Sequence, residues 1–187
     1  MEIHWGDDCQ LYVTPVGSTE VCVVSISRDQ HLRLADALPR FPELHRRLQA
    51  VGRATAERGS VTASRRLKRV CAGKVALVGD ASGSVDAITG EGLCLLFQQA
   101  AALADALAAP DLSLYQAAHR RVGRRPELMG DLMLLLDGRR RLRRRALRAM
   151  AERPGIFARM LAAHTGSLDL SGLLSNGLAL GWRMLCI

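Results

Sequence analysis

The chain has 187 residues, the size of one domain or slightly more. Apolar residue types make up 49% and charged types 24%, so extensive disorder is not expected. No run of about 20 uncharged apolar residues occurs, which argues against a spanning helix. The first eight residues lack a basic segment followed by an apolar one, so no secretory signal is expected. The five cysteines are scattered without a Cys-x-x-Cys pair, which argues against a zinc knuckle and favours the cytoplasm.

The net charge of +8 is a local property of one segment. Seven arginines lie within Arg139–Arg148, and without them the chain would carry +1. On a helix, Leu142, Ala146 and Met150 form the apolar side of this segment and the arginines form the polar side. Such a helix can be a solvated face, can contact an anionic membrane surface, or can bind nucleic acid. No aromatic residue within the run can stack on bases, so nucleic acid is the least expected partner.

The first third of the chain predicts a β-hairpin followed by short helices. Residues 9–26 alternate apolar and polar types, and Gly17 begins the expected turn. Pro15 cannot donate a ladder hydrogen bond and is expected at a strand end or edge. Two short helices are expected between Asp29 and Val51, the second beginning at Pro42.

The rest of the chain predicts one strand followed by helices. The apolar run 74–78 is typical of a strand covered on both faces, as in a parallel sheet. After a glycine-rich loop, residues 93–107 predict a largely buried helix. Further helices are expected after Pro110, one of them opening at Pro126 and ending near Gly138. The uncharged residues 170–182 are too short and too polar to span a membrane and favour a docking helix.

Residues 74–93 carry the main chemical signal. The strand ends at Asp80, where an open α/β sheet usually binds its ligand and where a carboxylate can accept hydrogen bonds from ligand hydroxyls. Thr89, Gly90, Glu91 and Gly92 then lead into the helix. Glycines allow a flat ligand close to the backbone, and the N–H groups of a helix N-terminus stabilise negative charge.

This segment resembles the second flavin-binding motif of the para-hydroxybenzoate-hydroxylase-like flavoproteins, most closely the geranylgeranyl-reductase-related oxidoreductases. Their pattern is an apolar strand, Gly-Asp-Ala, a short loop, Asp-Pro-x-x-Gly-x-Gly and a long helix. The chain departs from it at Ala87, where the family usually has proline. The residues that match the motif or would line the cofactor are Gly79, Asp80, Ala81, Asp86, Thr89, Gly90, Glu91, Gly92 and Leu93.

The resemblance implies a role for each part of the motif. Asp80 would bind the ribityl hydroxyls of FAD, and the backbone from Gly90 to Leu93 would lie against the pyrimidine edge of the isoalloxazine. NAD(P)H would be the reductant, and the substrate would be an isoprenoid or other lipid double bond, or a small molecule. The alternatives are a flavin-dependent aromatic monooxygenase and a non-catalytic basic helical module. Tyr12 and Pro15 resemble a short element on the substrate side of the family, and no catalytic acid or base is assigned.

The resemblance implies an α+β chain that forms part of an α/β FAD-binding fold. Its expected parts are a substrate-side sheet with short helices (1–72), an FAD-contacting strand–loop–helix (73–109) and a helical C-terminal region (110–187). No Gly-x-Gly-x-x-Gly follows an early strand, and that motif holds the ADP half of FAD. We therefore expect a missing N-terminal half or a partner chain, and weak flavin binding by this chain alone. The expected location is the cytoplasm, with peripheral membrane contact through Arg139–Arg148.

Overall fold

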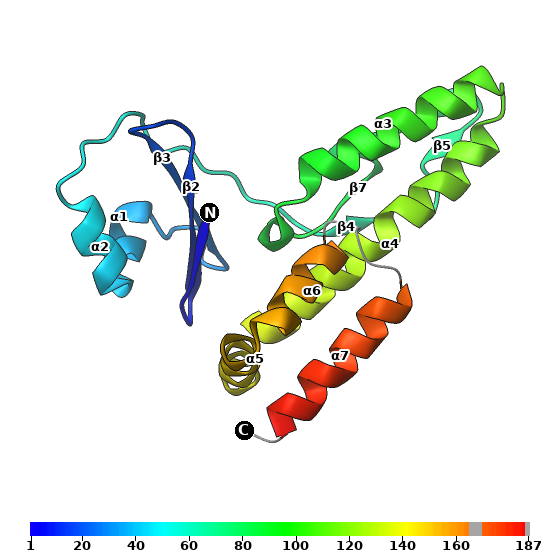
Figure 1. Cartoon of the computed structure of the whole chain (residues 1–187). Coiled ribbons are helices and arrows are strands. Elements are labelled where there is room, and N and C mark those ends of the chain that lie inside the picture. The colour runs from blue at the N-terminus through cyan, green and yellow to red at the C-terminus, as the bar shows by residue number, and fades with distance from the viewer. Residues whose placement is uncertain (165–169, 186–187) are drawn as a thin grey trace. The chain divides into compact units, whose positions relative to one another are not determined.

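A computed structural model describes residues 1–164 and 170–185 (Figure 1). Helices take 57% of the chain and strands 15%, with small antiparallel sheets, which confirms the α+β class. The chain forms two compact units, Met1–Thr62 and Ala63–Ile187. The segment boundary expected at residue 72 therefore lies inside the second unit.

A three-stranded antiparallel sheet forms the base of the first unit. Its strands are β1 (Glu2–Trp5), β2 (Cys9–Pro15) and β3 (Val21–Ser27), in the order β1-β2-β3. The predicted hairpin is confirmed, with Val13 opposite Val23. Pro15 occupies the last pair of the ladder, opposite Val21, as its missing N–H requires.

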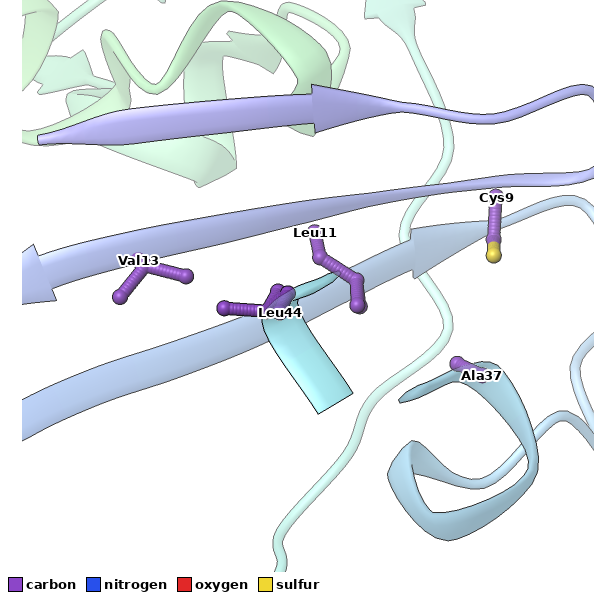
Figure 2. Packing of buried hydrophobic residues seen from close by; sticks show 5 residues of the cluster. All are labelled: Cys9, Leu11, Val13, Ala37 and Leu44. Carbon is purple, nitrogen blue, oxygen red and sulfur yellow. The ribbon is translucent and has the colours of Figure 1, made fainter. Parts of the chain in front are cut away.

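Short helices cover one face of this sheet. They are α1 (Leu34–Ala37), the 3₁₀ turn η1 (Leu38–Arg40) and α2 (Pro42–Leu48), which begins at Pro42 as predicted. Period-two alternation directs Cys9, Leu11 and Val13 of β2 to the same side, where they pack with Ala37 and Leu44 (Figure 2). Asp29 caps no helix, because its carboxylate accepts the His31 N–H at 2.9 Å within a local turn.

The prediction of a parallel strand at residues 74–78 is wrong. In the described part of the second unit, every strand has two residues: β4 (Arg65–Arg66) pairs with β7 (Gly83–Ser84), and β5 (Cys71–Ala72) pairs with β6 (Val75–Ala76). Both pairs are antiparallel. The β5–β6 hairpin turns at Gly73, whose φ of +56° suits glycine. Val75 and Ala76 therefore fold back and pair with residues 71–72.

Two long helices lie side by side in the second unit, α3 (Gly92–Ala108) and α4 (Leu112–Asp137) (Figure 1). Asp111 caps α4 by accepting the Ser113 N–H at 2.8 Å. The predicted helix start at Pro126 is wrong, because α4 continues through this proline and ends before Gly138. Pro126 is buried with Gly123 and Gly130 on one side of α4, where packing outweighs the lost backbone hydrogen bond.

The helix predicted over residues 93–107 is confirmed as α3, but its predicted burial is wrong. Leu93, Phe97 and Leu107 are 69%, 68% and 61% exposed. The opposite side, with Leu95, Gln99 and Ala106, is the buried one. Near the far end of α3, Ala106 packs with Val70 and Tyr115, and the tyrosine hydroxyl donates to the Leu77 carbonyl at 2.6 Å.

Three further helices follow in the described part of the second unit: α5 (Arg140–Glu152), α6 (Pro154–His164) and α7 (Leu170–Leu185). They contact one another, and Asn176 of α7 donates to the Ile156 carbonyl of α6 at 3.2 Å. Across the part of the chain that the structure describes, no helix combines the length and apolarity needed to cross a bilayer.

The packing of the first unit predicts a contrast between two valines. Val13→Ala removes two methyl-sized groups from the core and should lower the free energy of unfolding by about 1.6 kcal/mol or more. Val16→Ala, at an exposed position one residue after β2, should change it by less than about 0.5 kcal/mol. Urea unfolding followed by circular dichroism measures both, and equal effects would contradict this core.

Candidate functional site

The Gly79-Asp80-Ala81 part of the motif forms a 3₁₀ turn, η2 (Gly79–Ser82), packed on α3. Gly79 has a φ of +62°, which favours glycine, and a Cβ there would lie 2.9 Å from Leu96 Cδ1. The Gly79 N–H donates to the Gln99 side-chain oxygen at 2.8 Å. The turn is therefore held directly to the second and third turns of α3.

A buried polar network fixes this turn between two helices. Ser82 Oγ lies 2.8 Å from the Gly79 carbonyl, 3.1 Å from Gln99 Oε1 and 2.9 Å from His119 Nε2. The Gln99 side-chain nitrogen lies 3.2 Å from the same His119 nitrogen. Because an amide nitrogen only donates, this arrangement suits a neutral imidazole whose Nε2 accepts. Burial also lowers the pKa of His119.

This Ser–His contact is structural. Ser82 and Gln99 are each only 1% exposed, so the hydroxyl cannot reach a substrate. None of these three side chains was identified as a site residue from the sequence. One sequence signal could have indicated this network: Gln99 is a polar residue within an apolar helix, and it lies on the side of α3 that is buried.

The Asp80 side chain is exposed, whereas its backbone carbonyl is held by a hydrogen bond. Its carbonyl accepts Arg65 Nη2 at 2.7 Å. Within the described residues its carboxylate has no hydrogen-bond or ion-pair partner, so the oxygens are available to a ligand. Gly83 follows η2 with a φ of +124°, and a Cβ there would lie 2.6 Å from the Arg65 carbonyl, so only glycine allows this close strand pairing.

The second half of the loop is a capped turn, η3 (Ala87–Thr89). Asp86 Oδ1 accepts the Ile88 N–H at 3.0 Å, and Thr89 Oγ1 donates to the Asp86 carbonyl at 3.0 Å. Gly90 ends the turn with a φ of +67°. Asp86 and Thr89 therefore act within the loop itself, and Thr89 packs on α4 at Gly130.

The loop leads into the N-terminus of α3, which is not capped by a side chain. Glu91 is the N-cap residue and makes no side-chain capping hydrogen bond. In the part of the chain that the structure describes, the N–H groups of Gly92, Leu93 and Cys94 have no acceptor. Apart from the adjacent backbone, no atom of the described residues lies within 4 Å of where a Cβ would stand on Gly90 or Gly92. This helix end combines positive dipole, free donors and open space.

The side chain of Glu91 points into a polar contact with α6. Its Oε2 atom is buried, has no hydrogen-bond partner among the described residues, and lies 3.8 Å from His164 Nδ1. Burial raises the pKa of the Glu91 carboxyl, while His164 and Arg125 act in the opposite direction. His164 was not identified from the sequence, because it lies 73 positions from Glu91.

A cavity of about 360 Å³ borders the other side of the loop at Asp86. Arg66 in its lining contacts both oxygens of Asp131 at 3.0 Å and Glu127 at 3.4 Å, so a single positive charge faces two carboxylates there. Its lining residues are Ser64, Arg66, Ser84, Val85, Asp86, Glu127, Gly130, Asp131 and Leu134. Over the residues described, no cluster of three or more His, Cys, Asp or Glu side chains suits a metal ion.

Seven of the nine predicted residues lie in the loop that ends at Glu91, and Gly92 and Leu93 are the first two residues of α3. The turn η2 packs on α3, and η3 packs on α4. Tyr12 and Pro15 belong to the first unit, where the Tyr12 hydroxyl donates to Gln10 Oε1 at 3.0 Å and Pro15 is exposed. No family model, curated protein or solved structure matched this chain. The functional assignment therefore rests on these residues and their geometry.

The half-buried His119 predicts a pH dependence of stability. Since its pKa is lowered in the fold, the unfolded chain binds more protons below about pH 6.5, and stability is lost as the pH falls through that range. His119→Gln should remove this part of the slope. Urea unfolding between pH 5 and 8 measures it, with exposed His31→Gln as the control. A wild-type slope that persists in His119→Gln would contradict the assigned role.

Proposed function

We propose that this chain is part of an FAD-dependent oxidoreductase and that residues 79–93 hold the flavin. The observation that supports this most directly is the loop itself. One end presents the free carboxylate of Asp80, and the other presents the uncapped N-terminus of α3. Gln99 and Gly130 fix the two ends against α3 and α4.

The residues present fit this cofactor. A flat ring needs backbone without side chains, and the open positions above Gly90 and Gly92 supply it. The free N–H groups of Gly92 and Leu93 suit the polar edge of the ring. The carboxylate of Asp80 suits the hydroxyls of the ribityl chain.

FAD would supply hydride transfer, with NAD(P)H as the reductant. The chain's own contribution is electrostatic: the α3 N-terminus stabilises adjacent negative charge by about 0.3–1 kcal/mol, and by about 2 kcal/mol when partly buried. The Glu91 carboxyl makes no capping hydrogen bond and lies beside His164 of α6, so the N–H groups at the start of α3 stay open to a ligand. The resemblance to geranylgeranyl-reductase-related enzymes makes a lipid or isoprenoid double bond the proposed hydride acceptor.

The role of Asp80 is tested with two flavins. Asp80→Asn should weaken riboflavin binding about tenfold or more, because a hydrogen bond to a charged group contributes about 1.5–3 kcal/mol. Lumiflavin has no ribityl chain, so its binding should be unchanged. Quenching of flavin fluorescence by the purified chain, at high chain concentration, measures both.

Asp105→Asn, at an exposed position further along α3, is the matched control for this substitution. An equal loss for both flavins, or no loss for riboflavin, would contradict the assigned contact.

The glycine at the helix entrance provides an independent test. Gly90 and Gly73 both have positive φ and open space at the Cβ position, so Gly90→Ala and Gly73→Ala should cost similar stability, about 1–2 kcal/mol. Only Gly90→Ala places a methyl group in the proposed flavin space and should abolish lumiflavin binding. Thermal unfolding and fluorescence quenching measure the two effects. Unimpaired lumiflavin binding by Gly90→Ala would contradict the proposal.

A further inference from the structure

The arginines of α5 divide into one that is buried and several that are exposed. Arg143 is buried and donates to the Asp137 carbonyl at 3.1 Å, so it belongs to the fold. Four others lie three or four positions apart on one exposed face: Arg141, Arg144, Arg145 and Arg148. We name these four the arginine stripe.

The arginine stripe lacks counter-charges of its own. Within the described residues, none of its members makes an ion pair or a side-chain hydrogen bond. Like charges at this spacing destabilise a helix. The nearest acidic residue along α5, Glu152, is paired with Arg183 of α7. An external anionic partner would therefore relieve the repulsion.

Large apolar side chains are exposed on the same group of helices. Leu147 borders the stripe, three positions from Arg144, and is exposed. On α6, Phe157 and Leu161 are exposed at a spacing of four residues. On α7, Leu178 and Trp182 repeat that spacing and are 76% and 73% exposed. Both helices contact α5 (Figure 1).

We propose that α5, α6 and α7 form a docking surface for an anionic lipid bilayer. Guanidinium groups attract lipid phosphates and carboxylates, and exposed Trp, Phe and Leu side chains enter the headgroup boundary. The phosphates of nucleic acid could also pair with the arginines. Nucleic acid offers no apolar phase, however, in which the exposed apolar side chains of α6 and α7 could be buried. A second copy of the chain would bring two arginine stripes toward each other, which like-charge repulsion opposes.

The test measures binding of the full chain to vesicles by co-sedimentation. The chain should bind vesicles of phosphatidylcholine mixed with phosphatidylserine and not those of phosphatidylcholine alone, and added salt should weaken binding. Replacing all four stripe arginines by glutamine should reduce affinity roughly a hundredfold or more. The control replaces four exposed arginines of the first unit, Arg33, Arg46, Arg53 and Arg58, and should retain most binding.

A tryptophan reports the apolar part of the contact. The chain has two tryptophans, so Trp5→Phe leaves Trp182 as the single emitter. Its emission should shift to shorter wavelength when phosphatidylserine vesicles are added. Circular dichroism of each variant confirms that it is folded.

Three results would overturn the proposal. The first is no binding to anionic vesicles, or equal loss in the stripe and control variants. The second is stronger binding to duplex DNA than to vesicles with unchanged Trp182 emission, which would identify a nucleic-acid surface. The third is a dimer in sedimentation analysis that shields Trp182 without vesicle binding, which would identify a second copy as the occupant.

Discussion

The hydrogen bond from the Gly79 N–H to the side chain of Gln99 is the contact on which the candidate site depends. A turn with positive φ exposes backbone groups that strands and helices would normally satisfy. Gln99 satisfies one of them from the buried side of α3. Removal of this side chain would leave the Gly79 donor without its partner near the core, at a cost of about 1–3 kcal/mol.

The two ends of the loop are fixed by independent means, and this explains its residue types. Near Asp80 the backbone is held by Gln99 and by Arg65, which leaves the carboxylate free. Near Gly90 the turn is held by Asp86, whose Oδ1 atom accepts the Ile88 N–H. The two aspartates of the motif therefore differ: one is available to a ligand, and the other shapes the path of the chain.

Sequence patterns predicted the elements that depend on local signals. The hairpin of residues 9–26, the helix start at Pro42 and the start of a new helix after Pro110 follow from alternation and proline geometry, and all are present. The parallel strand at 74–78 was wrong because its apolar residues equally suit a short antiparallel hairpin packed on α3 and α4. The helix break at Pro126 was wrong because tertiary packing outweighs a single missing donor.

The candidate site was only partly predictable for a related reason. Residues 79–93 are contiguous, so their motif is visible in the sequence. The side chains that support them, Gln99, His119 and His164, come from three helices and carry no pattern of their own. Burial was also misjudged on α3, since periodicity identifies an apolar face without showing what covers it.

The structure also connects the two proposals through α6. Phe157, Leu161 and His164 are separated by four and three residues, so they form one stripe along this helix. The first two are exposed, and His164 contacts Glu91 at the entrance of α3. A bilayer that contacts Phe157 and Leu161 would thus lie along the helix that ends beside the proposed flavin. For a lipid substrate, this arrangement would place one end of α6 at the membrane surface and its last residue, His164, beside the proposed flavin.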